Sequence, residues 1–477
     1  MYSSGRSTLD QILSSRLIPF LTLDSPHDHQ DVLQHSKVRE VTSSQGPADS
    51  VNRIAVMAAK FSHVVDDIHH NRLFPSLSLP NSLDRSIMGV GRFLLNVLVV
   101  LAAVAGGFYQ FKLRPLLERF GHGRIIRSVG NTDCTGVPEL KACEKIVLHQ
   151  PTGVIYLACS TPESRVHWTP AVGHLNAEGA SREDYVATYD PLTQKITRLT
   201  VTGFTSKRGL SLHGMDVVPS ADDPDQLWVY LVNHRAPLEG DARKVGADSA
   251  IEVFKTIVGS SKLEYVRTVE DDTIITPNDL IGSPDGKSFY VTNDHGVKVG
   301  FSRDLEMLGR SATSVVYCHV DEGCKFAIQG MHGNNGIAQA PNGTIYVVNS
   351  LHGALNVLER QADNTLVLTD VIEVDRPMDN AMVDSEGHVW TAAFPKALTL
   401  VFKHFKDPVN VLSPSTAFRF SINTGEDAFY GKKFKVDRAF EDDGEIASGT
   451  TSAVYDAERN RLFLNGLAAP RLTICKL

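Results

Sequence analysis

The chain has 477 residues, 42% of them hydrophobic and 21% charged, which is the composition of a folded protein and excludes disorder over the whole length. Asp and Glu number 55 against 47 Lys and Arg, so the net charge is −8 and non-specific binding to nucleic acid is not expected. The 36 Gly and 22 Pro residues favour a turn-rich β protein over a helical bundle.

Residues 1–86 form an N-terminal segment that is rich in Ser and His and has no sustained apolar period of 2 or 3.6 residues. This composition predicts a disordered tail. Met88 offers a second start, after which the chain reads as a short basic start, an apolar stretch and a soluble domain. Residues 1–87 are therefore either a cytosolic tail or an over-extended gene prediction.

Residues 93–111 form an uncharged, mostly apolar stretch between Arg92 and Lys112. A membrane-spanning helix needs roughly 17–25 such residues, so we predict a single-pass signal anchor with its juxtamembrane helix over residues 87–121. The alternative is a buried core helix. More basic residues follow the stretch than precede it, and the positive-inside rule would then keep the following domain in the cytosol.

A turn followed by a short run of aromatic and β-branched residues recurs six times after residue 130. The equivalent aromatic positions are Tyr156, Tyr230, Tyr290, Tyr346, Trp390 and Phe463. Most copies carry Asp-Gly, Asn-Gly or a similar dipeptide before the run, which is typical of β-hairpins. A repeat unit of about 40–70 residues with several strands predicts an all-β fold, a six-bladed β-propeller, over residues 122–477. An αβ repeat is disfavoured because no amphipathic helix recurs between the copies.

The six cysteines bear on how the propeller closes and where it lies. Cys134 and Cys475 bracket the repeats, and a disulfide between them would hold the first and last blades together. Disulfides persist in oxidising compartments, so this one would place the propeller in the secretory lumen or outside the cell, against the charge rule. The other four leave two possibilities open, either free buried thiols or the pairs Cys143–Cys159 and Cys318–Cys324.

The triplet Asn342-Gly343-Thr344 matches the N-glycosylation sequon in a predicted turn. A glycoprotein would agree with the oxidising location that the cysteines predict.

Short polar pairs stand at strand ends in several of the repeats. They include Cys143-Glu144, His213-Gly214, Asn233-His234, Asn278-Asp279, Asn293-Asp294, Asn334-Asn335 and Asp379-Asn380. Each pair alone is typical of a turn. Gathered around a propeller axis, however, they would offer carboxylate and amide oxygens, which are the ligands that Ca²⁺ prefers.

With these motifs in this order, the sequence resembles the serum paraoxonase/arylesterase family of calcium-dependent lactonases, six-bladed propellers with an uncleaved N-terminal hydrophobic segment. The resemblance covers about residues 131–477. The matching motifs are ACEKIVL at 142–148, His213-Gly214-Met215, Val232-Asn233-His234, Asn278-Asp279-Leu280, T-N-D-H at 292–295, Asn335-Gly336-Ile337, Asp379-Asn380, and the terminal cysteines Cys134 and Cys475. The resemblance implies calcium-dependent hydrolysis of a small aryl ester or lactone.

The resemblance also implies two calcium sites. The ligands implied for the catalytic ion are Glu144, Asn278, Asn335, Asp379 and Asn380. A second, structural ion would use Asp279 and the main-chain carbonyl of Met215. The family has an Asp after the Glu, whereas this chain has Lys145, whose ammonium repels a cation. We therefore predict that the structural calcium is weakened or absent and that Lys145 stands in for it.

In the mechanism that the resemblance implies, His213 is the general base on the attacking water and His234 orients His213 or carries its proton onward. Ala393-Phe394 replaces a polar position of the family, which predicts a more apolar pocket. Two other functions remain open. One is a non-catalytic, membrane-tethered propeller that binds a protein or small ligand. The other is a hydrolase-like propeller of the gluconolactonase or strictosidine-synthase type.

Overall fold

The computed structural model describes residues 84–477, so almost the whole of the predicted disordered tail, residues 1–86, lies outside the described residues. Contacts within the chain divide it into two units, Met1–Phe93 and Leu94–Leu477. The bounds predicted for the tail, the anchor and the propeller domain stay a prediction.

A long helical segment precedes the strands. It consists of α2 (Asp84–Phe108), the π-helical turn η1 (Tyr109–Leu113) and α3 (Arg114–Arg119). The wider turn precedes Pro115, which lacks the N–H that an α-helix requires at that place. Phe93, Leu98 and Leu101 are 59–66% exposed, and an 18-residue window within Arg92–Arg119 has a mean hydropathy of 1.9. One described helix is therefore long and apolar enough to span a membrane.

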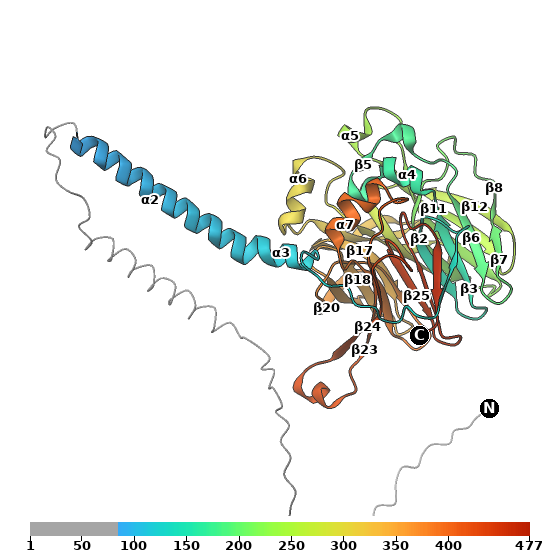
Figure 1. The fold of residues 1–477 in the computed structure, drawn as a ribbon. Helices are drawn as coiled ribbons and strands as arrows, with labels where there is room; N and C mark the ends of the chain where they lie inside the picture. Colours follow the sequence, from blue (N-terminus) through green and yellow to red (C-terminus); the bar gives the residue numbers. More distant parts are fainter. Residues whose placement is uncertain (1–83) are drawn as a thin grey trace, which may run out of the picture. The chain divides into compact units, whose positions relative to one another are not determined.

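Six four-stranded antiparallel units build the rest of the chain, as predicted (Figure 1). The first three blades are β2 (Cys143–His149), β3 (Val154–Cys159), β6 (Tyr185–Asp190) and β7 (Lys195–Arg198); then β9 (Leu212–Pro219), β10 (Gln226–Arg235), β11 (Asp248–Ile257) and β12 (Lys262–Val269); then β13 (Pro277–Gly282), β14 (Ser288–Asn293), β15 (Thr313–His319) and β16 (Gly323–Met331). A short strand, β8 (Thr200–Thr202), adds to the outer edge of the second blade in parallel.

The last three blades follow the same plan. They are β17 (Asn334–Gln339), β18 (Ile345–Asn349), β19 (Ala354–Arg360) and β20 (Leu366–Glu373); β21 (Met378–Val383), β22 (Val389–Ala393), β23 (Ser415–Ile422) and β24 (Phe434–Asp442); and β25 (Ser452–Asp456), β26 (Arg461–Asn465), β27 (Leu472–Cys475) and β1 (Cys134–Val137). The first strand of each blade contacts the first strands of the two neighbouring blades, so β2, β9, β13, β17, β21 and β25 close a ring.

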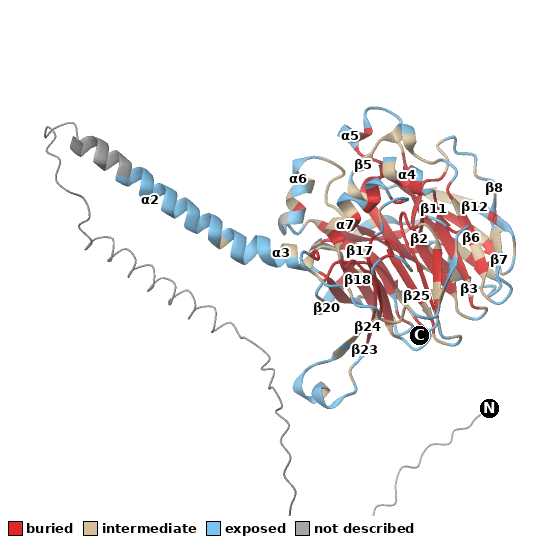
Figure 2. Ribbon diagram, viewed as in Figure 1, coloured by how far each residue is buried: buried red, intermediate tan, exposed pale blue. Residues whose placement is uncertain are grey.

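The repeated aromatic residues all lie on the second strand of their blades, on β3, β10, β14, β18, β22 and β26, and all are buried. Buried apolar residues fill the space between neighbouring sheets, and the strands form the buried interior of the propeller (Figure 2). The sequence repeat therefore corresponds to the strand that packs between neighbouring blades, where a large side chain buries the most apolar area.

The sixth blade takes its outer strand from the start of the domain. β1 pairs with β27, with Cys134 opposite Cys475, and these two residues form the predicted disulfide. The other four cysteines are also bonded, as Cys143–Cys159 and Cys318–Cys324. The two cysteines of each pair lie directly opposite each other on adjacent antiparallel strands, so the alternative of free thiols does not hold.

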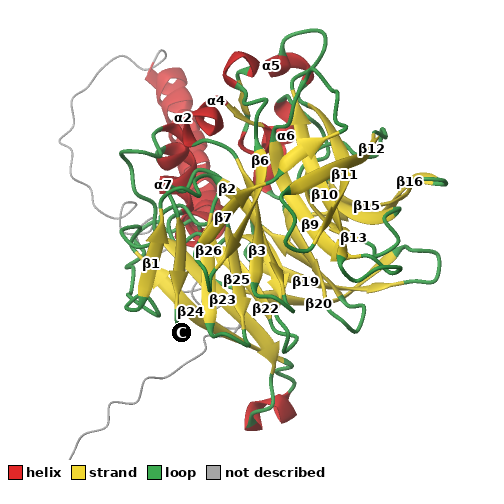
Figure 3. Cartoon of the chain, turned by 90° about the vertical axis from the view of Figure 1, so that its right-hand side faces the viewer, coloured by secondary structure: helices red, strands yellow, loops and turns green. Residues whose placement is uncertain are grey.

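Short helices connect the strands. They are α4 (Pro162–His167), α5 (Ala242–Val245), α6 (Phe301–Asp304) and α7 (Ala397–Phe402), with the 3-10 turns η2 (Pro170–Val172), η3 (Ala177–Gly179), η4 (Leu305–Leu308), η5 (His404–Lys406) and η6 (Glu426–Tyr430). A small ribbon of β4 (Trp168–Thr169) and β5 (His174–Leu175) stands beside α4. Figure 3 shows α4, α5 and α6 at the same end of the blades, away from the hairpin between β23 and β24.

Candidate functional site

Register irregularities in the inner strands mark the candidate site. In four blades the pairing of the inner strand with the second strand slips, between Cys143 and Lys145 on β2, Pro277 and Leu280 on β13, Asn334 and Ile337 on β17, and Met378 and Ala381 on β21. The slipped segments contain all five residues predicted to bind the catalytic ion. A bulge frees side chains from the strict alternation of a strand and turns them toward a common point. β9 slips in the same way around His213.

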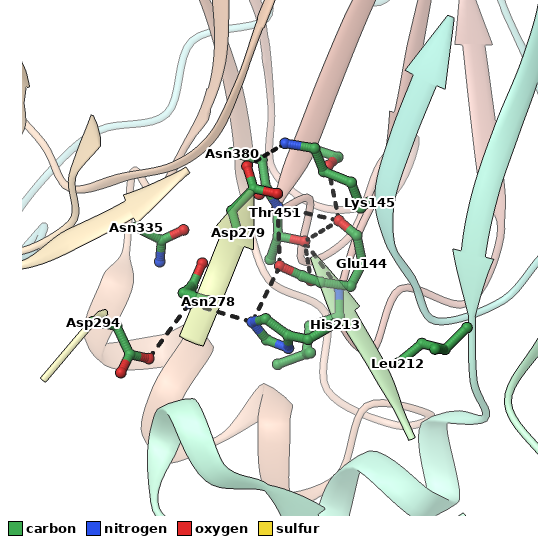
Figure 4. Close-up of polar contacts among 12 residues, drawn as sticks. Glu144, Lys145, Leu212, His213, Asn278, Asp279, Asp294, Asn335, Asn380 and Thr451 are labelled. Carbon is green, nitrogen blue, oxygen red and sulfur yellow. Dashed lines mark hydrogen bonds and ion pairs between the residues drawn. The ribbon is translucent and has the colours of Figure 1, made fainter. Parts of the chain in front are cut away.

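Glu144, on the first blade, stands at the centre of this group and is held by residues of the fifth and sixth blades (Figure 4). Its Oε1 accepts a hydrogen bond from the amide of Asn380 at 2.9 Å, and its Oε2 accepts one from Thr451 at 2.6 Å. Ser452 donates to the main-chain oxygen of Glu144 at 2.8 Å. The carboxylate is 2% exposed and its position is therefore fixed from both sides.

Three buried oxygen atoms around Glu144 have no hydrogen-bond partner among the described residues. They are Oδ1 of Asn278, Oδ1 of Asn335 and Oδ1 of Asp379. A buried oxygen without a donor is costly, on the order of 1–3 kcal/mol for each group. Three such oxygens beside a buried carboxylate match the donor set of a hard divalent cation.

Two buried carboxyl groups, Glu144 and Asp379, meet at the same place. Burial raises the pKa of Glu144 to about 7. Burial and the neighbouring charge of Glu144 together raise the pKa of Asp379 well above its usual range. Carboxylates that repel each other in a dry site are stabilised by a cation between them.

The residue after Glu144 points to the other side of β2. The ammonium of Lys145 forms a buried ion pair with Oδ2 of Asp279, and both side chains are at most 5% exposed. The same oxygen of Asp279 accepts from the N–H of Ile337 at 3.0 Å, while Lys145 also reaches the carbonyl of Ala381 at 3.4 Å. Asp279 therefore has Lys145 as its cationic partner, in agreement with the prediction that Lys145 stands in for a structural calcium.

His213 and His234 lie next to each other on the neighbouring strands β9 and β10. Their ring centroids are 5.0 Å apart. The amide of Asn278 lies 3.3 Å from Nε2 of His213, and Oε1 of Glu144 lies 3.9 Å from it. Nδ1 of His234 bonds Ser249 at 2.9 Å, whereas Nδ1 of His213 and Nε2 of His234 have no partner among the described residues.

Both imidazoles are kept neutral. Burial, with the positive charge of Arg165 as a further cause, lowers the pKa of His213 well below its usual range and that of His234 to about 3. A neutral imidazole has one unprotonated nitrogen, which is the form from which a general base acts.

An apolar-walled cavity of about 300 Å³ opens over this group. Glu144, His213, Asn278, Asn335 and Asp379 are among the residues that line it. Its walls include Phe394, as predicted, and apolar residues of α7 and the following turn: Leu398, Val401, Phe402 and Phe405. The loop after β3 contributes Ala171, Val172 and Gly173 to the lining.

Sequence analysis missed several residues of the site. Thr451 holds Glu144 from just before the inner strand of the sixth blade, where residues 447–452 include no acid, amide or His that would have marked the site. Arg165 donates from α4 to the carbonyl of Leu212 at 2.7 Å and lies in a segment without a repeat pattern. Asp294 was part of a matching motif but received no role, and its Oδ2 lies 3.4 Å from the amide of Asn278.

A different acidic group lies on the turn between β21 and β22. Oxygens of Asp384 and Glu386 each lie 3.3 Å from Nδ1 of His388. The two oxygens of Asp384 already accept hydrogen bonds from Trp390, at 2.8 Å, and from the N–H of His388, also at 2.8 Å. This group is separate from the predicted ligands and is satisfied by the protein itself.

Comparison with known proteins agrees with the motifs. A profile of the arylesterase family matches residues 152–477. Serum paraoxonase/arylesterase 1 of Rattus norvegicus is 26% identical over 59% of this chain and 73% of that protein. Serum paraoxonase/arylesterase 2 of Homo sapiens is 28% identical over 54% of this chain and 66% of that protein. Serum paraoxonase/lactonase 3 of Homo sapiens is 21% identical over 74% of this chain and 91% of that protein.

Proposed function

Because the chain belongs to the arylesterase family, we propose that it hydrolyses carboxylic esters, either aryl esters, lactones or both, with the help of one calcium ion. The observation that carries the proposal is the set of unpartnered, buried oxygens of Asn278, Asn335 and Asp379 around Glu144, at the base of an apolar cavity. The names of the similar proteins support the same class of substrate.

The residues present fit one calcium ion. Glu144, Asn278, Asn335 and Asp379 would hold it through their oxygens, and Asn380 would contribute by fixing Glu144 or by its own carbonyl oxygen. A bound calcium ion supplies positive charge that polarises the ester carbonyl and stabilises the negative charge formed on its oxygen. The second, structural ion that the family resemblance implies does not fit, because the ammonium of Lys145 already pairs with Asp279.

His213 is the proposed general base. Its Nε2 faces the cavity beside Asn278, where a water molecule that attacks the carbonyl carbon would give up its proton. The unpartnered Nδ1 of His213 and Nε2 of His234 support transfer of that proton to His234, whose ring Ser249 holds in place. Both rings are neutral at neutral pH, so each carries one unprotonated nitrogen.

The cavity walls support an apolar substrate. Phe394, Leu398 and Phe402 would contact an aromatic ring or an alkyl chain, while the polar base of the cavity holds the ester group. The walls offer few hydrogen-bonding groups for a strongly polar substrate.

We further propose that the chain is anchored in a membrane through residues 93–111, with the propeller in the secretory lumen or outside the cell. The exposed apolar helix supports the anchor, and three disulfides support an oxidising compartment over the cytosolic placement that the basic residues favour. Asn342 is exposed in the turn between β17 and β18, where a glycan would have access.

The decisive experiment measures hydrolysis of phenyl acetate and δ-valerolactone by the full chain, produced in an oxidising host and kept in detergent. We expect activity that a calcium chelator abolishes and that calcium restores. The variant His213→Gln should lose about 10²–10⁴-fold in kcat. His319→Gln, at the outer end of β15, is the matched control and should keep full activity.

Chelator-sensitive activity that survives in His213→Gln would remove this residue from the mechanism but keep the metal. A folded, calcium-binding protein without turnover of either substrate would contradict the esterase and favour the membrane-tethered binding propeller.

A further inference from the structure

A second carboxylate–imidazole pair faces the cavity and has no role in the mechanism above. His295 lies two residues after the end of β14, and its Nδ1 lies 2.8 Å from Oε2 of Glu306 on η4. The other carboxylate oxygen of Glu306 accepts from the N–H of Gly296 at 3.1 Å. The Glu306 side chain is 2% exposed, whereas the His295 side chain is 16% exposed.

The main chain of His295 is fixed as firmly as its ring. Its N–H donates to the hydroxyl of Thr276 at 2.9 Å, and the same hydroxyl donates back to the carbonyl of His295 at 2.7 Å. The residue before it, Asp294, contacts the amide of Asn278. His295 is therefore fixed next to Asp294, which contacts Asn278, one of the residues that would bind the metal.

The orientation of the ring assigns its two nitrogens. Nδ1 faces the buried carboxylate, which accepts its proton, so Nε2 is the nitrogen left to face the cavity that His295 lines together with Glu144 and His213. No hydrogen bond to Nε2 is found within residues 84–477. A buried carboxylate behind an imidazole whose far nitrogen faces a substrate cavity is the arrangement that suits proton transfer.

We propose that His295, positioned by Glu306, gives a proton to the leaving oxygen of the ester. The proposal rests on the proposed ester hydrolysis. Water adds to the carbonyl carbon and loses its proton to His213. His295 enters this step as the imidazolium, with its Nδ1–H held by the Glu306 carboxylate and a second proton on Nε2. The bond between the carbonyl carbon and the leaving oxygen then breaks, its electron pair stays on that oxygen, and the oxygen takes the proton from Nε2 of His295, which becomes a neutral imidazole. Solvent removes the proton from His213 and returns one to His295, so the sum is ester plus water giving acid plus alcohol.

His213 as base and His295 as acid act on different atoms of the ester. His213 lies beside Asn278 and Glu144, where the attacking water would stand, while the leaving group departs on the other side of the carbonyl carbon. A phenoxide is a weak base and leaves without a proton, whereas an alkoxide is a strong base and needs one. His295 should therefore matter for alkyl esters and lactones and hardly at all for phenyl esters.

The test compares phenyl acetate with benzyl acetate, which share the acyl group and an aromatic ring but differ in the basicity of the leaving oxygen. In the full chain, we expect His295→Gln to lower kcat/KM for benzyl acetate by about 10²-fold. The value for phenyl acetate should change little. Glu306→Gln removes the carboxylate but keeps its shape, and it should shift the ratio of the two values in the same direction by a smaller factor.

The ratio of the two substrates is measured on one sample, so it does not depend on how much of a variant is folded. His319→Gln serves as the matched control and should leave the ratio unchanged. Equal losses on both esters in His295→Gln would overturn the proposed role and leave ester hydrolysis intact. Wild-type protein that hydrolyses neither ester would overturn the proposed function, and the role of His295 with it.

Discussion

At the scale of single residues, Lys145 has the largest consequence. It puts an ammonium into the interior and pairs it with Asp279, which would otherwise be a buried, uncompensated carboxylate. Burial raises the pKa of Asp279 even with this partner present. Removing one member of a buried ion pair typically costs about 3–5 kcal/mol, because the other charge stays in a dry site.

Lys145→Met should therefore lower the free energy of unfolding by about 3–5 kcal/mol, measured by denaturant titration. Calorimetric titration of the wild type should give one calcium per chain. Lys145→Asp should give a second calcium, since two carboxylates and the carbonyl of Met215 would then face one another. Lys141→Asp makes the same charge change at an exposed position and should leave the count at one. Two calcium ions in the wild type would refute the role of Lys145 as a built-in cation.

At the scale of elements, the bulged inner strands position the site. They approach one another so closely that Gly336 of β17 has no room for a side chain: a Cβ there would lie 2.5 Å from Cα of Asn380 and 2.6 Å from the nitrogen of Ala381. The neighbouring residues, Asn335 and Asp379, carry two of the unpartnered oxygens. The absence of a side chain at this position thus allows oxygens from two blades to meet.

Gly336→Ala should push β17 and β21 apart, lower calcium affinity by at least about tenfold, and destabilise the fold by about 1–3 kcal/mol, as overpacking usually does. Calcium titration and thermal unfolding measure the two effects. Gly425→Ala is the control, because its Cβ would meet only the ends of the Asn423 and Asp427 side chains, and it should change neither quantity. Unchanged calcium affinity in Gly336→Ala would show that the bulges do not set the ligand geometry.

At the scale of the whole molecule, closure of the ring depends on contacts between the two ends of the propeller. β1 completes the sixth blade, and the disulfide Cys134–Cys475 links positions 341 residues apart. The Cys318–Cys324 disulfide closes a loop with a sequence separation of only 6. In the chain-entropy account, a longer loop gains more stability from the bond, because the unfolded chain loses more freedom.

Replacing Cys134 and Cys475 together by Ser should lower the free energy of unfolding by about 5–6 kcal/mol on this account. The double replacement of Cys318 and Cys324 is the matched control and should cost less, by about 2–3 kcal/mol on the same account. Denaturant unfolding of both proteins under oxidising conditions measures the difference. Equal losses would show that native-state packing, rather than ring closure, dominates.

The sequence by itself determined the number of blades, the second strand of each blade and the types of ligand atom. These features follow local patterns, since alternation, turn residues and buried aromatics are set by neighbours within one hairpin. It also identified Cys134 and Cys475 as the pair that brackets the repeats, while it left the pairing of the other four cysteines open.

Only the tertiary structure decided how these parts meet. Thr451 bonds Glu144 across 307 residues of sequence, and Glu306 reaches His295 from a turn with no repeat pattern. Much of the cavity wall comes from α7, the turn after it and the loop after β3, which lie between strands and follow no period that a sequence shows. The apolar period of a strand indicates which of its faces is buried. It does not indicate which side chains of other blades lie opposite, because ring closure and bulges set the distance and direction between side chains of different blades.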